Sequence, residues 1–487
     1  MNDSTTPRGM TELVAVRAEH RLASLLELAR PRSYGYVNRV VGLSVTVSGL
    51  TGRIGDLLTI GDGGGGAPML AEVVAVDGHE CTCLPLGEMA GIGNGDRVSS
   101  TGGPLLVGVG AQLRGRVLDG LGKPLDGRPL PDVLDYVPVE MAPPAALGRR
   151  RVDQPMPLGV RAIDSLISVG RGQRMGIFAG SGVGKSSLLS MITRGTSAEI
   201  TVVALIGERG REVREFLEND LGPDGLRNAV VVVATSDQPP MVRLRAAFVA
   251  TRIAEWFRDQ GQDVLLLMDS VTRLATAQRE VGLSAGEPPA SRGYPPSVFA
   301  LMPRILERAG GGESGSITGL YTVLVEGEDH NEPVADTARS ILDGHIVLDR
   351  RLATAGHFPS IDVLESVSRV VNAVTTPEQQ RVARRARQLL AARRDVKELV
   401  EIGAYVAGSN PLADQALALW PALEAFLQQD MAERSNVEQT WAGLAGALGM
   451  PLPETSARAK SEGGMSEHRP EERSEWAMSA RAKSEGK

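Results

Sequence analysis

Residues 178–192, FAGSGVGKSSLLSMI, place glycines, a lysine and paired serines between an apolar run and a helical pattern. A turn that holds a phosphate must bring several backbone N–H groups to its oxygen atoms, and only glycine tolerates the required dihedral angles and close approach. A lysine can reach the outer phosphates, a serine hydroxyl can bind Mg²⁺, and the following helix points its positive end at the anion. The stretch therefore predicts a phosphate-binding loop.

The loop follows the pattern G-x-x-x-x-G-K-S/T except at its first position, where Ala179 replaces glycine. That position is commonly relaxed, and the strand-like RMGIF before the loop and the helix-like SSLLSMITRG after it fit the motif. We assign Lys185 to the outer phosphates and Ser186 to Mg²⁺; a chance glycine-rich turn is the alternative. The predicted nucleotide contacts in the loop are Ala179, Gly180, Ser181, Gly182, Val183, Gly184, Lys185, Ser186 and Ser187.

Two carboxylates follow other apolar runs. Asp269 closes VLLLMD, where a lone carboxylate is costly unless it serves an ion. Because Mg²⁺ prefers oxygen ligands and keeps several waters, we expect Asp269 to act through water on the metal held by Ser186. Capping the next helix is the alternative role. In LIGERGREV, Glu208 is the candidate to activate a water, with Arg209 holding the carboxylate or a phosphate; a structural ion pair is the alternative.

The elements that must position these groups are predicted from the pattern of apolar and polar residues along the chain. RMGIFAG, TVVALIG, AVVVVAT and DVLLLMDS alternate with helical runs such as MVRLRAAFVATRIAEWFRDQ, which predicts an α/β domain whose parallel sheet is covered on both faces. Before it, VVGLSVTVSGL, DLLTI, AEVVAVDG and ECTCLPL are expected to be strands of a small barrel or sandwich. Residues 110–130 and 142–159 are expected to be connecting segments.

The two ends of the chain differ from the middle. Residues 10–30 have apolar residues near helical spacing and predict an amphipathic helix, which packs on its own domain or docks a partner. After Thr376 the pattern becomes helical. From Pro451 onward, balanced charge and the octet SARAKSEG, at 456–463 and again at 479–486, are typical of a disordered tail.

Composition narrows the classes of function. A chain of 487 residues is expected to form two or three domains, and a net charge of −7 argues against constitutive nucleic-acid binding. No run of 18 apolar residues and no signal-peptide pattern are present, which predicts a cytoplasmic protein, and any membrane contact is expected to be peripheral. Cys81 and Cys83 are expected on one face of a strand, as small half-buried residues rather than half of a zinc site.

The order of these pieces resembles the rotary and export ATPase family, which includes the catalytic subunits of F-type and V-type ATPases. GERGRE resembles its catalytic-glutamate motif, and PSIDVLESVS at 359–368 its signature decapeptide. GYPPSVFALMPRILERAG, YTVLVEGEDHNEPVADTARSILDGHIVLDRRLA and IGAYVAGSNPLADQAL are similar to the ATPases of type III protein export, with the flagellar branch as first choice and the injectisome branch second. The resemblance covers roughly residues 25–440.

The resemblance implies a multidomain fold and further site residues. By motif, Arg369 in SVSRV is implied to be an arginine finger that reaches the γ-phosphate held by a neighbouring chain, and Phe358 to stack on adenine. Without the family, Arg369 is a surface ion-pair partner, and a buried core position remains an alternative for Phe358. The expected domains are an N-terminal docking segment (1–30), a β-barrel (31–106), a RecA-like nucleotide-binding domain (107–375), a helical domain (376–450) and the tail (451–487).

The activity implied is hydrolysis of ATP with Mg²⁺ by a homohexamer that energises protein export. The implied partners are a stator-like regulator at the N-terminus, a central stalk-like protein, export substrates with their chaperones, and gate proteins at the inner face of the cytoplasmic membrane; no nucleic acid is expected. The loop 280–296 is a candidate inward-facing coupling segment. Competing hypotheses are a non-hydrolysing nucleotide-binding subunit, an RNA-translocating hexamer and an ATP synthase subunit.

Overall fold

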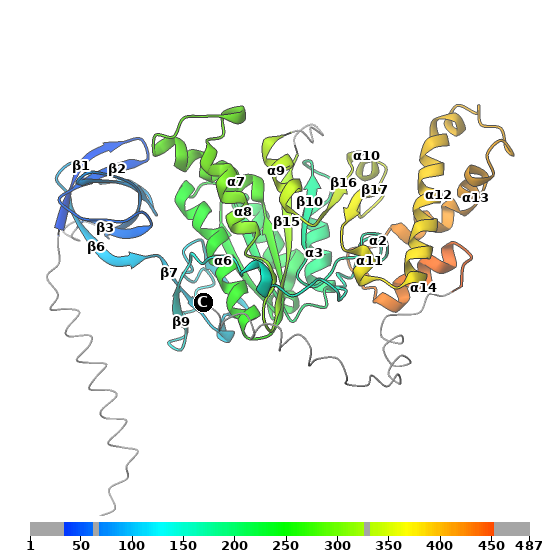
Figure 1. Ribbon diagram of the computed structural model, residues 1–487, viewed down its shortest axis with the longest axis horizontal. Helices are drawn as coiled ribbons and strands as arrows, with labels where there is room; N and C mark the ends of the chain where they lie inside the picture. Colours follow the sequence, from blue (N-terminus) through cyan, green and yellow to red (C-terminus); the bar gives the residue numbers. More distant parts are fainter. Residues whose placement is uncertain (1–33, 62–67, 326–331, 452–487) are drawn as a thin grey trace, which may run out of the picture. The chain divides into compact units, whose positions relative to one another are not determined.

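A computed structural model describes residues 34–61, 68–325 and 332–451 (Figure 1). The chain divides into two units, each made of segments that are distant in sequence. We call the unit Met1–Arg149 with Glu199–Ile341 the barrel unit, and the unit Arg150–Ala198 with Leu342–Lys487 the loop unit. The predicted N-terminal helix and the tail with its repeated octet lie outside the described residues. The predicted domain bounds remain predictions.

The first part of the barrel unit is a closed six-stranded barrel with the order β1-β2-β5-β4-β3-β6, visible in blue in Figure 1. Its apolar side chains alternate inward, and Cys81 and Cys83 lie on one face of β5 as expected. They are fully buried in the barrel core and not half-buried, because that face of β5 points inward. The barrel class of fold is therefore confirmed for this segment. The strands are β1 (Tyr34–Val41), β2 (Ser44–Ser48), β3 (Asp56–Ile60), β4 (Met69–Asp77), β5 (Glu80–Pro85) and β6 (Arg97–Pro104).

Two details of the predicted barrel were wrong. The run VVGLSVTVSGL is not one strand, because Gly42, at a φ of 57°, turns the chain between β1 and β2. The segment RVSSTGGP was not predicted as a strand, yet as β6 it pairs with both β1 and β3 and closes the barrel. Its glycines conceal its strand character in the sequence, and the pairing partners on both sides stabilise it.

The second part of the barrel unit is a parallel sheet in the order β15-β13-β11-β12-β8. Three predicted apolar runs form β11 (Ile200–Ile206), β12 (Ala229–Ala234) and β13 (Asp263–Asp269), and β15 spans Ser316–Leu324. Segment 110–130 is not merely a connection, because β8 (Arg116–Asp119) pairs with β12 and extends the sheet. The short strand β14 (Gly310–Gly311) pairs antiparallel with β15, and β7 (Leu106–Val109) pairs with β9 (Asp135–Pro138).

Helices pack on this sheet. Every residue of β11 and β12 is buried, and strands that are buried along their whole length have both faces covered. The predicted helix in 241–260 is α6 (Pro240–Asp259), and it contacts β11, β12 and β13. The other helical elements of the unit are the 3₁₀ turns Ala111–Leu113, Ala146–Gly148 and Ser291–Gly293, α4 (Gly210–Glu215), the π-helical Phe216–Leu221, α5 (Gly222–Leu226), α7 (Val271–Ser284), α8 (Pro296–Leu306) and α9 (Pro333–Ile341).

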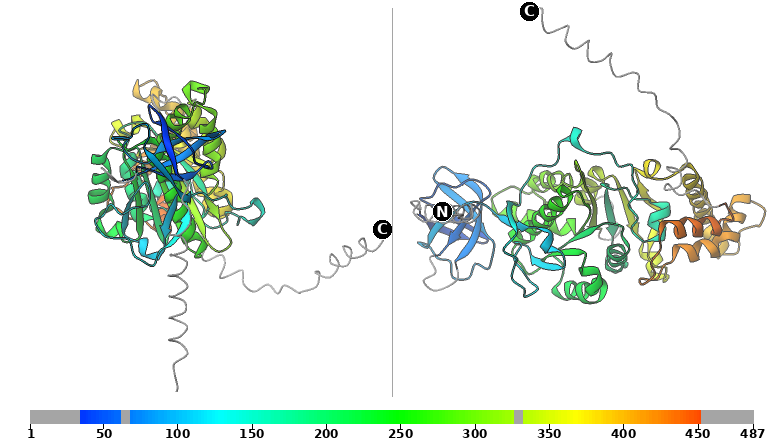
Figure 2. Two further views of the ribbon diagram at one scale, coloured as in Figure 1. Left: turned by 90° about the vertical axis from the view of Figure 1, so that its left-hand side faces the viewer. Right: turned by 90° about the horizontal axis from the view of Figure 1, so that it is seen from below.

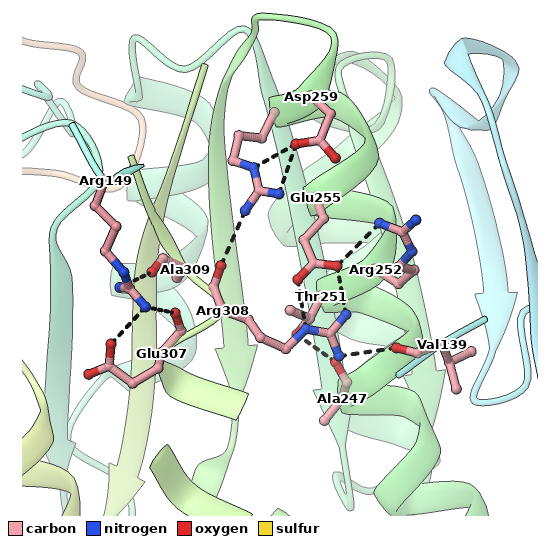
Figure 3. Close-up of polar contacts among 11 residues, drawn as sticks. Val139, Arg149, Ala247, Thr251, Arg252, Glu255, Asp259, Glu307, Arg308 and Ala309 are labelled. Atoms are coloured by element: carbon pink, nitrogen blue, oxygen red, sulfur yellow. Dashed lines mark hydrogen bonds and ion pairs between the residues drawn. The ribbon is translucent and has the colours of Figure 1, made fainter. Parts of the chain in front are cut away.

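Buried ion pairs fasten α6 to its surroundings (Figure 3). The guanidinium of Arg308, just after α8, bonds the Glu255 carboxylate of α6 through Nε–Oε1 and Nη2–Oε2 distances of 2.7 Å, and both side chains are 1% exposed. Arg308 Nη1 also donates to the carbonyl of Val139 at 3.0 Å. Arg245 on α6 forms a second buried pair with Glu72 of β4, which joins the helix to the barrel.

The loop unit contains the strand and helix predicted around the phosphate loop. β10 (Arg174–Ala179) pairs parallel with β16 (Gly344–Leu348), which pairs antiparallel with β17 (Ile361–Ser368). Helix α3 (Lys185–Gly195) follows the loop. The C-terminal helices α12 (Pro377–Glu401), α13 (Pro411–Leu427) and α14 (Val437–Ala447) pack on one another (Figure 2) and confirm the predicted helical region. Short helices α2 (Arg161–Leu166), α10 (Arg350–Thr354) and α11 (Val371–Val374) complete the unit.

Local sequence sets the starts of the C-terminal helices. Thr376 and Gln379 form a capping box at α12, and Asn436 and Gln439 form another at α14. Each box satisfies backbone N–H groups that have no partner inside the helix. Among the described residues, no helix is long and apolar enough to cross a membrane.

Candidate active site

The phosphate loop connects β10 to α3 in the loop unit, as predicted. Gly182 and Gly184 have φ angles of 74° and 86°, a region that side chains strongly disfavour, so the glycines are required by the backbone itself. Helix α3 begins at Lys185, and its first N–H groups face the loop without a side-chain cap. These groups form the anion-binding end of the helix. Ala179 is the buried last residue of β10, where a methyl group is accommodated.

Neighbouring side chains hold the loop in shape. The Ser360 hydroxyl, 1% exposed, donates to the carbonyl of Val183 at 2.5 Å. Arg350 Nη2 donates to the carbonyl of Ser181 at 3.3 Å. A Cβ added at Gly184 would lie 3.3 Å from Cε1 of Phe358, so the phenyl ring covers the end of the loop. The loop is therefore braced by residues that come about 170 positions later in the chain.

Beside the loop lies a cavity of about 660 Å³, within the size range of small-molecule sites. Phe358 contributes to its wall and is 45% exposed, so the alternative of a buried core phenylalanine is wrong. Another part of the wall was not predicted, because it comes from the end of α13 and the segment after it, outside the expected nucleotide-binding domain. The residues that line the cavity are Arg161, Gly184, Ser187, Leu188, Met191, Gly356, Phe358, Pro359, Ala425, Gln428, Gln429, Asp430, Met431 and Glu433.

Glu208 follows β11 in the barrel unit. Its carbonyl accepts from the Ser236 N–H at 3.0 Å, and the N–H of the preceding Gly207 donates to the Ala234 carbonyl at 2.6 Å. Gly207 has a φ of 71°, and a Cβ there would lie 2.9 Å from Cβ of Arg273. The turn that presents Glu208 therefore depends on glycine and on the stem of Arg273. Neither contact was predicted, because both partners lie outside the GERGRE motif.

Arg209 lies beside Glu208 but is mostly exposed. Its Nη1 is 3.4 Å from Oε1 of Glu212, in an ion pair whose arginine side chain is 74% exposed. Such an exposed pair contributes little to stability. The ion-pair alternative is thus present for Arg209 within the described residues, and its role toward a phosphate remains a prediction.

Asp269 ends β13 and is 5% exposed. Its Oδ1 accepts a hydrogen bond from the Thr322 hydroxyl at 2.7 Å. The cap of the following helix is Ser270, whose Oγ accepts from the Arg273 N–H at 3.2 Å, so the capping alternative for Asp269 is wrong. Thr322 was not singled out from the sequence, because only the register of β15 beside β13 brings it to Asp269.

Glu208 and Asp269 share one edge of a sheet. Leu205 of β11 pairs with Asp269 of β13, and the two strands are parallel, so the chain leaves both strands on the same side. Active sites of open α/β sheets form at such carboxyl ends. The barrel unit thus carries at one sheet edge the two residues predicted to activate water and to serve the metal.

A second cavity of about 460 Å³ lies near the same strand ends. Its polar lining includes Arg273 and Arg292, and Arg292 has a φ of 46°, which is uncommon for a residue other than glycine. The predicted loop 280–296 was partly wrong, because residues up to Ser284 belong to α7 and a 3₁₀ turn spans Ser291–Gly293. The cavity is lined by Thr272, Arg273, Thr276, Arg292, Tyr294, Leu324 and Glu332.

Arg369 follows the last residue of β17 and is exposed. Its backbone N–H donates to the carbonyl of Asp343 at 3.0 Å. The Asp343 carboxylate in turn bonds the Arg174 guanidinium at 3.0 Å. The backbone that carries Arg369 is therefore anchored to β10, the strand that leads into the phosphate loop.

The predicted residues fall into two groups. In the loop unit the structure brings together the phosphate loop and Phe358, and in the barrel unit it brings together Glu208 and Asp269. The glycine cradle fits a polyphosphate, and the serine hydroxyl and the carboxylate are the hard oxygen donors that Mg²⁺ takes. Among the described residues, no cluster of three His, Cys, Asp or Glu side chains could hold a metal by itself.

Comparison with known proteins identifies the family. Residues 159–368 match the model of the ATP synthase alpha/beta family, nucleotide-binding domain, and residues 375–446 match that of the T3SS EscN ATPase C-terminal domain. The chain is 51% identical to the flagellum-specific ATP synthase of Bacillus subtilis, over 86% of this chain and 96% of that one. It is 48% identical to the type 3 secretion system ATPase of Xanthomonas euvesicatoria, over 88% and 97%.

A solved structure agrees with these matches. It is that of the assembled ATPase EscN in complex with its central stalk EscO, from the type III secretion system of enteropathogenic E. coli, with a TM-score of 0.79, 46% identity, and coverage of 85% of this chain and 100% of that one. Barrel, nucleotide-binding domain and C-terminal helices are shared. The chain belongs to the ATP synthase alpha/beta family, within the group of flagellum-specific and type III secretion ATPases, and is an ATPase that uses ATP with Mg²⁺.

Proposed function

We propose that this ATPase works as a homohexameric ring that energises type III protein export for assembly of the flagellum. The observation that carries the proposal is the pair of carboxylates, Glu208 and Asp269, at adjacent parallel strand ends in a chain that also carries a complete phosphate loop. A subunit that only binds nucleotide has no need of a water-activating carboxylate. The flagellar assignment follows the 51% identity to the flagellum-specific relative of Bacillus subtilis.

Each residue has a chemical role in the proposed site. The backbone N–H groups of 179–187 and Lys185 would bind the phosphates. Ser186 would hold Mg²⁺, and Asp269 would act on the ion through water. The ion would supply positive charge that neutralises the phosphate oxygens. Glu208 orients the attacking water and takes up its proton, Arg209 stabilises nearby negative charge, and Phe358 stacks on the adenine.

Arg369 is proposed to act on the nucleotide of the neighbouring subunit. It is exposed at a strand end, and its backbone is fixed by Asp343, so the guanidinium is carried on a rigid base. A guanidinium supplied in trans stabilises the charge of the transferring phosphoryl group and is worth about 10³–10⁵ in rate where it has been measured. The EscN relative, described as assembled, supports the ring.

The first proposed partner is inferred from a relative of known structure. EscN binds a central stalk, and we propose a stalk-like protein for this ring as well. The further proposed partners are a stator-like regulator at residues 1–30, export substrates with chaperones, and gate proteins at the cytoplasmic face of the inner membrane. We propose accordingly that the ring works in the cytoplasm, bound peripherally to the export apparatus.

Mixing two inactive variants tests the shared site. Glu208→Gln lacks the water-orienting carboxylate, and Arg369→Ala lacks the finger, so each ring alone should lose ATP hydrolysis. In an equal mixture, roughly a quarter of the interfaces join an intact Glu208 to a neighbour's intact Arg369, because a ring interface is head-to-tail. We expect ATPase activity to return in proportion to this fraction of complete interfaces. The activity should also rise cooperatively with protein concentration.

Matched controls are Glu215→Gln and Arg381→Ala, which alter exposed helix positions and should keep full activity. Specific activity that does not change with concentration, together with no recovery in the mixture, would contradict the shared site. Retained phosphate release by Glu208→Gln would contradict its assigned role.

An injectisome function is the second candidate, since the relative from Xanthomonas euvesicatoria is 48% identical over nearly all its length. Deletion of the gene in its host separates the two. The flagellar proposal predicts cells without filaments that are restored by the wild-type gene and not by Lys185→Ala. Motile cells that have lost secretion of effector proteins would support the injectisome function.

A further inference from the structure

The side chain of Gln429 is a buried polar group that no catalytic role explains. It follows α13 in the loop unit and is 5% exposed. Burying an amide without hydrogen-bond partners costs free energy of folding. The partners of this side chain therefore indicate its structural role.

Gln429 makes four hydrogen bonds, three through its side chain and one through its backbone N–H. Its Nε2 donates to the carbonyls of Gly159 at 2.9 Å and Glu433 at 3.1 Å, and its Oε1 accepts from the Arg161 N–H at 2.8 Å. Its backbone N–H donates to the carbonyl of Phe358 at 2.9 Å. The side chain therefore uses both amide hydrogens and its oxygen.

These contacts fix one wall of the cavity beside the phosphate loop. Arg161 Nε also donates to the carbonyl of Phe426 at 3.0 Å, and Arg194 Nη2, from the end of α3, donates to the carbonyl of Met431 at 2.9 Å. The wall segment 426–433 is thus held by side chains from α2 and α3, and Gln429 is its central member.

The backbone of the same segment reaches the phosphate loop. The Gln429 N–H donates to the carbonyl of Phe358, and the Phe358 ring covers Gly184. The side-chain bonds of Gln429 to Gly159, Arg161 and Glu433 fix where that backbone lies, so a side-chain change at Gln429 acts on the phenyl ring through the wall segment. The glycine cradle keeps its own support, because Ser360 bonds the carbonyl of Val183.

We propose that Gln429 is a positioning residue for the nucleotide base: it holds Phe358 and the 426–433 wall in the arrangement that binds the purine. This inference rests on the proposed function of the cavity as the base site. It predicts that Gln429 affects binding of the base and ribose, and leaves binding of the polyphosphate unchanged.

Two magnesium-bound ligands separate these effects. ATP carries the base, and inorganic tripolyphosphate carries only the phosphates, so its inhibition constant in the ATPase assay measures the cradle alone. Because displacement of Phe358 weakens its stacking on the base, we expect Gln429→Leu to raise KM for ATP about tenfold, which corresponds to about 1.4 kcal/mol. We expect kcat and the inhibition constant of tripolyphosphate to stay within about twofold of wild type.

A second variant and a control keep the test decisive. Gln429→Glu nearly preserves shape but opposes two carbonyl oxygens with a carboxylate, so it should raise KM as well. Gln415→Leu removes an exposed glutamine of α13 that bonds Arg385, and should leave KM unchanged. In a Phe358→Ala background the Gln429→Leu effect should largely disappear, because coupled residues are not additive.

The outcomes distinguish the two proposals. A wild-type protein without ATP hydrolysis would overturn the proposed function. An active wild type in which both Gln429 variants match Gln415→Leu would overturn the inference. Equal weakening of ATP and tripolyphosphate would also overturn it, because that result indicates a general loss of structure.

Discussion

Removal of the Thr322 hydroxyl tests whether Asp269 serves a metal. The hydroxyl donates to Oδ1 of Asp269 at 2.7 Å, and the two residues are 0% and 5% exposed. Thr322→Val keeps the shape and deletes the donor. A hydrogen bond to a charged group is worth about 1.5–3 kcal/mol, and each tenfold change corresponds to about 1.4 kcal/mol. We therefore expect the Mg²⁺ concentration for half-maximal ATPase activity to rise about 10–100-fold, the range typical of outer-shell changes.

The assay is the ATPase rate at saturating ATP against free Mg²⁺ concentration, and high Mg²⁺ should restore most of the rate. Thr322→Ser retains the hydroxyl and should resemble wild type. Thr318→Val is the matched control, since Thr318 is buried on the same strand face about 13 Å away along the strand. If Thr322→Val needs no more Mg²⁺ than wild type or Thr318→Val, the assignment of Asp269 to the metal is wrong.

Three further changes probe the framework of the site. Glu255→Leu should lower the free energy of unfolding by about 3–5 kcal/mol in urea titrations, because it leaves the buried charge of Arg308 without its partner. A Glu255→Leu, Arg308→Met double variant should regain most of the lost stability. Gly207→Ala should abolish ATP hydrolysis while ATP still binds, because φ is 71° and the new Cβ meets Arg273; wild-type turnover would refute this. Burial raises the pKa of Asp164 to about 7, so the folded state binds the extra proton and stability should fall by about 1.4 kcal/mol per pH unit between about pH 4 and pH 7. The fall should be absent in Asp164→Asn, as urea midpoints at pH 5 and 7.5 would show.

Several features could be predicted from sequence because their causes are local. The loop between β10 and α3 depends on the dihedral angles of Gly182 and Gly184 and on the helix that starts at Lys185. The strands before Glu208 and Asp269 are continuous apolar runs because their sheet is covered on both faces. The carboxyl ends of such strands are where polar groups gather, so the two carboxylates could be placed at one edge.

Other features could not be predicted because they depend on pairing between distant segments. β6 contains two glycines, and β8 lies in a segment rich in turns, so neither shows a strand pattern; their partners in the barrel and in the sheet decide both. Likewise, motif similarity suggested Phe358 as an adenine contact but could not exclude a core position, which its exposure of 45% does.

The sequence by itself determined the chemistry of this protein: which residues can cradle a phosphate, which carboxylates end apolar strands, and which helices have caps. These properties depend on neighbours within a few positions. Only the tertiary structure decided which side chains support them. Thr322 reaches Asp269 across 53 positions, and Gln429 reaches Gly159 across 270. Such contacts are set by strand register and by the packing of whole elements. The residues around a hydroxyl or an amide in the sequence form no pattern that predicts its distant partner.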